Sequence, residues 1–313
     1  MNKIKTFTNK KFIVIVATLC CLLWGSAYPA VKTGYLLFNI ATQDIPSKLV
    51  FAGYRFTLAG MIVLIIAQLY GNNIFKLSSK NVSDLLLLGL TQTAMQYIFF
   101  YIGLANTTGV NGAILNSTGA FFSVILAHFI YIDDNLNTKK IIGCILGFAG
   151  VMIVNFNAAL FNFSFNLIGD GFIVIAAFIF AAGAIYGKKL AANLDVMVLT
   201  GYNLFIGGIV LTLLGLFTGG RVHNFTIISS SLLIYMALLS SAAFTLWALL
   251  LKYNKVGSVT IFNFLIPVFG ALLSSIFLGE SIFELKNLAA LLLVCLGIWM
   301  VNSISNKRNQ KPN

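Results

Sequence analysis

The sequence predicts an all-α integral membrane protein with ten transmembrane helices, arranged as two inverted five-helix repeats. The prediction rests on the low content of charged residues, the distribution of positive charge among the loops, and an internal repeat. Of the 313 residues, 59% are hydrophobic and 9% are charged, and the mean hydropathy is +0.95. Soluble domains carry about 25% charged residues, so this chain has too little charge to cover a water-facing surface.

Ten apolar stretches are separated by short polar gaps. A helix needs about 20 apolar residues to cross a hydrocarbon core of about 30 Å, so ten spans leave no segment for a soluble domain. Each span should be a helix, because isolated strands cannot satisfy their backbone polar groups in lipid. The predicted spans are 12–35, 48–70, 82–105, 109–132, 138–157, 168–190, 196–218, 229–252, 257–279 and 285–304.

The first span follows the basic segment 1–11 and is interpreted as an uncleaved helix. Its apolar run is longer than the core of a signal peptide, which has about 7–15 residues, and no clear cleavage site follows it. Turn-forming residues mark the later gaps, and they include Asp44 and Pro46, Gly71 to Asn73, Asn106 to Gly109, Asp133 to Asn137, and Gly219 with Gly220. Residues 305–313 are expected to be a short polar tail.

Positive charge is sorted by loop. Cytoplasmic loops of membrane proteins are enriched in Lys and Arg, because these charges resist translocation. With both termini in the cytoplasm, the cytoplasmic segments hold Lys3, Lys5, Lys10, Lys11, Lys76, Lys80, Lys139, Lys140, Lys188, Lys189, Lys252, Lys255, Lys307, Arg308 and Lys311. The outer segments hold only Lys32, Lys48, Arg221 and Lys286. This bias predicts a multi-pass protein of the inner or plasma membrane with both termini cytoplasmic.

The formal net charge of +12 is spread thinly over the cytoplasmic segments. No platform of aromatic and basic residues accompanies it, so nucleic acid is not expected as a partner, and the charge is assigned to attraction by anionic lipid headgroups of the bilayer. Cys20, Cys21, Cys144 and Cys295 all lie in apolar spans without the spacing of a metal site. No metal and no cofactor are therefore expected.

An internal repeat divides the chain into the five-span units 12–157 and 168–304. Residues 85–155 fall on 232–302 at an offset of 147 without a gap, so that Asn116 meets Asn263 and Gly150 meets Gly297. Earlier in each half, Gly53 and Gly60 correspond to Gly201 and Gly208 at an offset of 148. Because five spans are an odd number, the second unit enters the membrane from the opposite side. Inverted repeats of this kind are typical of secondary transporters.

Charged groups within the spans are few. All eight acidic residues fall at span ends or in loops, which disfavours ion coupling through a carboxylate at mid-depth. Arg55 lies within the second span and is interpreted either as a snorkelling or carbonyl-packed side chain or as an anion anchor for a solute. His128, late in the fourth span, either hydrogen-bonds a neighbouring helix or helps to move a proton.

The fourth and ninth spans each carry one polar helical face. In the ninth span the face consists of Asn263, Pro267, Gly270 and Ser274, and in the fourth of Asn116, Ala120, Ser123 and Ala127. Buried amides need partners, so these faces either line a watery cavity or pack tightly on other helices. Pro267, and Pro29 in the first span, should bend their helices. The fourth span has no matching proline, which leaves its bending open.

Other spans add uncharged polar groups and aromatic rings. They include Trp24, Ser26 and Tyr28 in the first span, Gln92, Thr93, Gln96 and Tyr97 in the third, and Ser240, Ser241, Thr245 and Trp247 in the eighth. Such a lining suits a small zwitterionic or amphipathic solute better than a multivalent anion, because no Arg cluster is present. Small-residue patterns at Gly143, Gly147, Gly150, Gly201, Gly207 and Gly208 indicate helix contacts, within the chain or in a homodimer.

At nearly full length, from residue 12 to 304, the chain resembles the EamA-type members of the drug/metabolite transporter superfamily. The resemblance is carried by Leu23-Trp24-Gly25-Ser26, Tyr54-Arg55-Phe56 with Ala59, Ile266-Pro267-Val268-Phe269 and Leu278-Gly279-Glu280. It implies ten helices around a central cavity and export of amino acids, their relatives and other small metabolites. Carried over to this sequence, the cavity candidates are Trp24, Ser26, Gln92, Gln96, Asn116, Tyr186, Trp247 and Asn263.

The sequence therefore predicts a secondary transporter that moves a small organic solute by alternating access, with export as the direction that the resemblance implies. Residues 183–188 have the wrong spacing for a phosphate-binding loop, so ATP is not expected to drive transport within this chain. A channel or a lipid translocator of the same architecture remains the alternative. An enzyme is not expected, because no catalytic motif occurs in the spans.

Overall fold

The structure is a computed structural model that describes residues 3–107, 109–156, 165–278 and 285–303. All regular secondary structure in these residues is helical. The first part of the chain contains α1 (Lys3–Phe7), α2 (Lys10–Leu37), α3 (Ile45–Leu69), α4 (Ser79–Leu88), the π-helical η1 (Gly89–Met95), α5 (Gln96–Ala105), α6 (Gly109–Asn116), α7 (Gly119–Ile130) and α8 (Thr138–Val154).

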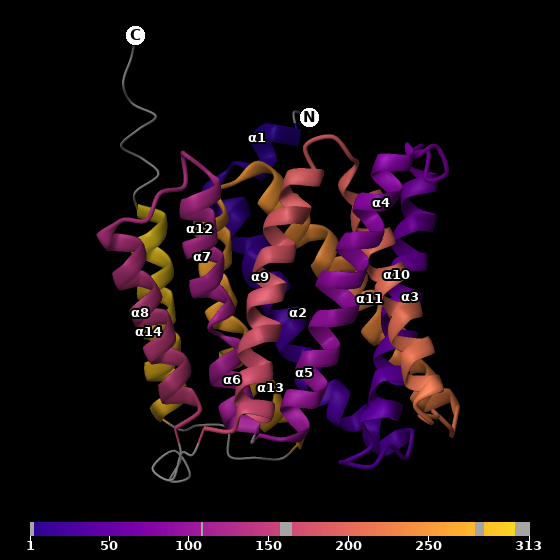
Figure 1. Cartoon of the computed structure of the whole chain (residues 1–313). Coiled ribbons are helices and arrows are strands. Elements are labelled where there is room, and N and C mark those ends of the chain that lie inside the picture. The colour runs from indigo at the N-terminus through magenta and orange to yellow at the C-terminus, as the bar shows by residue number, and fades with distance from the viewer. Residues whose placement is uncertain (1–2, 108, 157–164, 279–284, 304–313) are drawn as a thin grey trace.

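The second part contains the π-helical η3 (Leu167–Gly171), α9 (Phe172–Leu190), α10 (Val196–Phe217), α11 (Ile227–Tyr253), α12 (Val256–Thr260), the 3₁₀-helical η4 (Ile261–Phe264), α13 (Leu265–Leu278) and α14 (Leu285–Asn302). Figure 1 shows these helices side by side in one bundle. We call the end of the bundle that carries α1 and the loops 131–137 and 254–255 the α1 end, and the opposite end the far end.

Eight helical stretches in the described residues are long and apolar enough to cross a membrane. They are Lys10–Leu37, Ile45–Leu69, Ser79–Ala105, Asn111–Ile130, Leu167–Leu190, Val196–Phe217, Ile227–Tyr253 and Val256–Phe277. Leu288–Asn302 is a shorter apolar helix, and α8 has 17 residues. The chain is thus an all-helical, multi-pass membrane protein, as the composition predicted.

Four predicted spans differ from the expected single α-helix, and one of them, 168–190, begins in the π-helical η3. Residues 82–105 contain the π-helical η1, and the ninth span changes to 3₁₀ geometry in η4 just before Pro267. The fourth span is interrupted between α6 and α7 although it has no proline. There Ser117 Oγ donates to the Ile114 carbonyl at 2.6 Å and Thr118 Oγ1 to the Leu115 carbonyl at 2.5 Å, and such bonds compete with the helical backbone pattern.

Two pairs of helices approach each other through glycines. Helices α3 and α10 pack together so closely that a Cβ on Gly53 would lie 2.8 Å from the Gly208 carbonyl oxygen, and one on Gly60 2.7 Å from that of Gly201. Since real Cβ atoms do not come so close to backbone atoms, these positions require glycine. The predicted glycine contact at Gly201 and Gly208 is therefore made within the chain.

The second glycine contact joins α8 and α14, which lie side by side in Figure 1. A Cβ on Gly143 would lie 2.8 Å from the Gly297 carbonyl oxygen, and one on Gly150 2.8 Å from the Ala290 carbonyl oxygen. The remaining contacts place α2 against α11 and α13, and α9 against α5 and α7. Helices α2 and α9 thereby form the centre of the bundle.

Candidate functional site

An aromatic cluster occupies the interface between α2, α9 and α11. The rings of Trp24 and Trp247 lie 5.1 Å apart between centroids in an edge-to-face arrangement. Phe244 and Phe180 complete the cluster, at 5.4 Å and 6.5 Å from Trp24. Edge-to-face pairs at these distances are favourable, so the cluster is a fixed apolar wall contributed by both parts of the chain.

Several buried polar atoms near the bundle interior have no hydrogen-bond partner among the described residues. They include Gln96 Oε1, Thr200 Oγ1, Thr245 Oγ1, Trp247 Nε1 and Asn263 Oδ1. Leaving one buried polar group unpaired costs about 1–3 kcal/mol, and native proteins pair more than about 90% of such groups. A set of unpaired donors and acceptors from several helices is the arrangement expected where a polar ligand or water binds.

A hydrogen-bonded amide network borders this region. Asn203 Nδ2 of α10 donates to Gln92 Oε1 at 2.9 Å, and Thr93 Oγ1 donates to Asn203 Oδ1 at 2.9 Å. Gln92 and Thr93 both belong to η1, so the network fixes the π-helical segment against α10. These bonds order the side chains of Gln92, Thr93 and Asn203.

One cavity lies at the α1 end and a second lies beside the aromatic cluster. The larger has a volume of about 500 Å³ and is lined by residues that include Lys10, Asp133, Lys252 and Asn302. The smaller has a volume of about 30 Å³ and is lined by Gln92, Asn203 and Trp247 among others. We call the larger cavity, at the α1 end, the vestibule. Lys188 lines both cavities, so its side chain lies between the vestibule and the smaller cavity beside the aromatic cluster.

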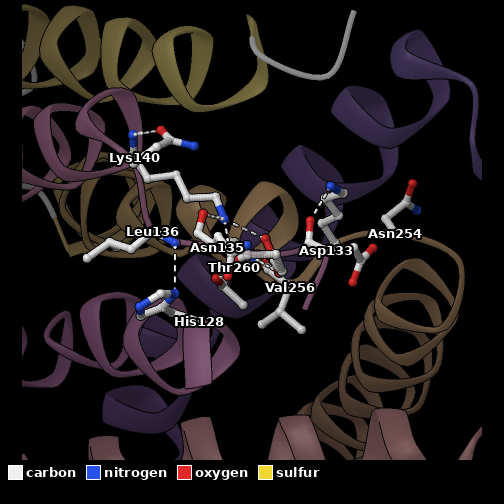
Figure 2. A network of polar contacts seen from close by, with 12 residues as sticks. His128, Asp133, Asn135, Leu136, Lys140, Asn254, Val256 and Thr260 are labelled. Atoms are coloured by element: carbon white, nitrogen blue, oxygen red, sulfur yellow. Dashed lines mark hydrogen bonds and ion pairs between the residues drawn. The ribbon is translucent and has the colours of Figure 1, made fainter. Parts of the chain in front are cut away.

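Polar contacts at the α1 end join the loop 131–137 to α12, as Figure 2 shows. Lys140 Nζ donates to Asp134 Oδ1 at 2.6 Å and to the backbone carbonyls of Asp134 and Asn135 at 2.7 and 2.8 Å. Asp134 Oδ2 accepts the Gly257 N–H at 3.0 Å. The side chains of Lys140 and Asp134 are 6% and 2% exposed, so this is a buried ion pair, and the bond of Asp134 to Gly257 links it to the second part of the chain.

Further contacts surround this ion pair. Lys188 Nζ donates to the Leu251 carbonyl at 2.7 Å and to that of Asn254, and Lys255 Nζ donates to the Asp133 carbonyl. Burial, with Asp134 and Asp133 nearby, raises the pKa of the Tyr131 hydroxyl, which keeps it neutral. We call the set Asp133, Asp134, Lys140, Lys188, Lys255 and Gly257 the α1-end network. Sequence reasoning treated its lysines only as loop charges.

The predicted cavity residues are distributed over several parts of the bundle. Trp24, Trp247 and Gln92 border the central region just described. Ser26 Oγ donates to the Leu23 carbonyl at 2.8 Å and lies 2.7 Å from Tyr235 Oη. Tyr186 lies apart, because its hydroxyl donates to Asp84 Oδ1 at 2.8 Å between α9 and α4.

Asn116 and Asn263 lie at the interruptions of the fourth and ninth spans, Asn116 as the last residue of α6 and Asn263 within η4. Gln96, buried, begins α5 directly after η1. Pro267 is the third residue of α13, immediately after the 3₁₀ segment, whereas Pro29 lies inside α2, which remains one helix of 28 residues.

The two predicted charged side chains have separate environments. His128 Nδ1 accepts the Leu136 N–H at 3.2 Å, which ties α7 to the loop that follows it and leaves its other ring nitrogen as the protonated one when the ring is neutral. Arg55 is 4% exposed, and its Nε donates to Ser240 Oγ at 2.8 Å. Neither side chain forms an ion pair with a described residue.

Comparison with known proteins gives matches over nearly the whole chain. The model of the EamA-like transporter family matches twice, at residues 11–156 and 167–303. An uncharacterized transporter of Bacillus subtilis, YvbV, is 29% identical over 295 residues, covering 91% of this chain and 89% of the relative. An uncharacterized transporter of Archaeoglobus fulgidus is 28% identical, covering 87% and 91%.

A protein of Salmonella typhimurium named a probable amino-acid metabolite efflux pump is 26% identical over 301 residues, covering 91% of this chain and 93% of the relative. Among solved structures, one superposes with a TM-score of 0.78 at 14% identity, covering 97% of this chain and 100% of that chain. At this identity the structural match shows the fold alone.

Proposed function

Because the chain belongs to the EamA-like transporter family, we propose that it is a secondary transporter of the plasma membrane that exports amino acids or related small metabolites by alternating access. The efflux role is supported by the name of the Salmonella relative. We also propose that the α1 end faces the cytoplasm, because the chain concentrates its positive charge at that end.

The observation that carries the alternating-access proposal is the symmetry of the two glycine contacts. In the repeat, Gly53 corresponds to Gly201 and Gly60 corresponds to Gly208. If the two units exchange places, the contact between Gly53 and Gly208 becomes a contact between Gly201 and Gly60. Both contacts exist. Helices α3 and α10 thus run antiparallel, and the reciprocal contacts support the proposal that the two helices are equivalent. That is the relation produced by an axis in the membrane plane, as in inverted-repeat transporters.

The other interhelix contacts support the same axis. At the offset of 147, Gly143 corresponds to Ala290 and Gly150 corresponds to Gly297. The contact between Gly143 and Gly297 therefore has its counterpart in the contact between Ala290 and Gly150, and both contacts occur between α8 and α14. The packing of α2 on α13 and α11 likewise corresponds to the packing of α9 on α7 and α5. We infer ten spans in two inverted five-helix units, 12–157 and 168–304, that rock against each other about these glycine contacts.

We infer a solute site between α2, η1, α9, α11 and the interrupted fourth and ninth spans. Interrupted helices expose backbone polar groups, and transporters place them around solute sites near the bilayer midplane. The unpaired atoms of Gln96, Trp247 and Asn263 would supply hydrogen bonds, and the Trp24–Trp247 pair an aromatic wall. This combination suits a small amphipathic or zwitterionic solute.

Counterflow in proteoliposomes tests the proposal. Vesicles containing the purified protein and a high internal concentration of one unlabelled amino acid or related metabolite are diluted into trace labelled solute of the same kind. A carrier accumulates label transiently and saturably, and an excess of unlabelled solute outside suppresses it. A channel would let the label equilibrate without overshoot, and a flat response to every solute in a panel of amino acids and their metabolites would refute the proposed function.

A further inference from the structure

Arg55 is a buried cation whose compensating anion is absent from the described residues. Its Nε–Ser240 bond is its only hydrogen bond to them, and Ser240 Oγ in turn donates to the Met236 carbonyl at 2.8 Å. Arginine carries five N–H donors and stays charged, so its two terminal nitrogens remain available. A buried charge without a partner is strongly unfavourable.

The acidic residues do not supply the missing partner. Asp44 and Asp195 cap the N-termini of α3 and α10, Asp84 accepts from Tyr186, and Asp170 accepts from Thr107. Asp133 and Asp134 lie in the α1-end network, where Asp134 forms the ion pair with Lys140 found among the described residues. Glu280 and Glu284 lie outside the described residues. The six acidic residues with described positions are thus engaged elsewhere.

Tyrosine rings of α5 lie next to the ring that Arg55 packs on. The Phe56 and Tyr97 rings are 4.5 Å apart between centroids, and the Tyr97 and Tyr101 rings are 6.0 Å apart. The Tyr35 hydroxyl is buried and lies next to the Tyr101 hydroxyl. A guanidinium group with unpaired N–H donors, close to phenol hydroxyls, forms an environment for an anion. A carboxylate meets the requirement, because arginine binds it through two parallel hydrogen bonds.

A continuous aromatic surface connects this site with the central cluster. The Arg55 guanidinium carbon lies 4.9 Å from the centre of the Phe56 ring. The Phe56 and Phe244 rings are 6.2 Å apart, and Phe244 lies 5.4 Å from Trp24. Along α11, Ser240 and Trp247 are separated by seven residues, or about 10 Å at 1.5 Å per residue. An anion at Arg55 and an apolar group at the Trp pair would therefore be about 10 Å apart.

We propose that Arg55, with the neighbouring tyrosine hydroxyls, binds the carboxylate of the transported solute, whose apolar body lies along Phe56 and Phe244 toward Trp24 and Trp247. The proposal rests on the proposed transport function and narrows its substrate class. The solutes are amino acids or organic acids with a carboxylate at one end and an aromatic or aliphatic group at the other. A cation without a carboxylate is excluded from the site by the guanidinium charge.

A binding measurement tests the site without requiring transport. The chain has three tryptophans, and Trp299 is 67% exposed, so Trp299→Phe leaves the Trp24–Trp247 pair as the source of intrinsic fluorescence. Purified protein in this background is titrated with 4-phenylbutyrate and with 4-phenylbutyramide, which has the same shape but no charge. Hydrogen bonds to a charged group contribute about 1.5–3 kcal/mol, so the carboxylate should bind at least about tenfold tighter.

Variants assign this preference to Arg55. Arg55→Gln should reduce the carboxylate preference to nearly none, and Arg55→Lys should retain part of it, because a lysine keeps the charge but not the two-pronged geometry. Lys32→Gln removes an exposed cation from α2 and should leave the preference unchanged. Equal affinities for the two probes in the parent protein would overturn the proposal even if the Arg55 variants did not fold.

The result separates this inference from the proposed function. One outcome is that the parent and Arg55→Gln both show counterflow of a solute and neither prefers carboxylates. This outcome refutes the Arg55 site but not the proposed carrier function. An Arg55-dependent carboxylate preference with no counterflow for any solute in the panel supports the site and refutes the carrier.

Discussion

The ion pair between Asp134 and Lys140 offers a direct test of how the α1 end is held together. Asp134→Asn keeps an oxygen that can accept the Gly257 N–H but removes the charge opposite Lys140, whose side chain is 6% exposed. Leaving one member of a buried ion pair unpaired costs about 3–5 kcal/mol. Lys140 retains two backbone carbonyls, so we expect a loss near the lower limit, about 3 kcal/mol.

This loss of free energy destabilises the conformation in which the α1-end network is formed. Since about 1.4 kcal/mol changes an equilibrium constant tenfold, about 3 kcal/mol favours separation of loop 131–137 from α12 by roughly 100-fold. Asp134→Asn combined with Lys140→Met should recover at least half of the loss, because no charge is then left unpaired. Asp195→Asn is the matched control. It removes an acidic charge from a helix N-cap at the same end, and asparagine caps a helix as well as aspartate does.

The separation of loop 131–137 from α12 can be measured by the accessibility of a cysteine placed in the vestibule. Ser258 lines the larger cavity, and Cys295 is exposed while the other three cysteines are buried, so Ser258→Cys in a Cys295→Ser background gives one reactive thiol. In nanodiscs, Asp134→Asn should raise the rate of labelling by a membrane-impermeant maleimide and lower the Tm, and the double variant should reverse both. Unchanged labelling and Tm in Asp134→Asn, or no rescue by Lys140→Met, would refute the structural role of this pair.

Three further outcomes are expected. Asn116→Ala and Asn263→Ala should each slow counterflow by about tenfold, the effect of one lost hydrogen bond to solute, with no loss of Tm; normal counterflow in both would refute the cavity assignment. Gly60→Ala should lower stability by about 1–3 kcal/mol, because its Cβ would lie 2.4 Å from the Phe205 backbone nitrogen, and an unchanged Tm would contradict the close contact. Tyr186→Phe removes a hydroxyl that bonds Asp84 outside the central region, so its counterflow rate should equal that of the parent, and a large loss would return Tyr186 to the solute site.

The sequence was sufficient for the helical class and the membrane location, because both follow from hydropathy summed over long windows. Trp24, Trp247 and Gln92 could be chosen from it because tryptophans and glutamines within the spans are few, but their part in a solute site stays a prediction. The interruption between α6 and α7 could not be read from it. It depends on Ser117 and Thr118 bonding to their own helix, and serines and threonines do this in many helices that stay intact.

The α1-end network was missed for a different reason. Lys188 fits the pattern of cytoplasmic charge, and nothing in its local sequence indicates that its ammonium group reaches the end of α11, 63 and 66 residues later in the chain. Arg55 stood out in the sequence because it is charged within a span. Its lack of a described anionic partner emerges only when the positions of the six described acidic residues are known.

The repeat also predicts an asymmetry between the two ends of the molecule. At the offset of 147, Asp134 and Lys140 correspond to Ser281 and Asn287, which cannot form an ion pair. If the two units exchange roles during transport, the ion pair stabilises closure of the α1 end, whereas the side chains at the two corresponding positions supply no such pair. We therefore expect the two conformations to be unequal in energy and the empty carrier to rest with the α1-end network formed.

Installing the missing pair at the far end should reduce this difference. We expect Ser281→Asp combined with Asn287→Lys to favour closure of the far end and so to open the α1 end, which would raise labelling of Ser258→Cys as Asp134→Asn does. Each single substitution introduces an unpaired charge and should lower the Tm, whereas the pair should restore it, because ion pairs compensate each other's desolvation. Slower labelling in the double variant would mean that the two ends are not related by the repeat, and the exchange of roles between the units would lose its structural basis.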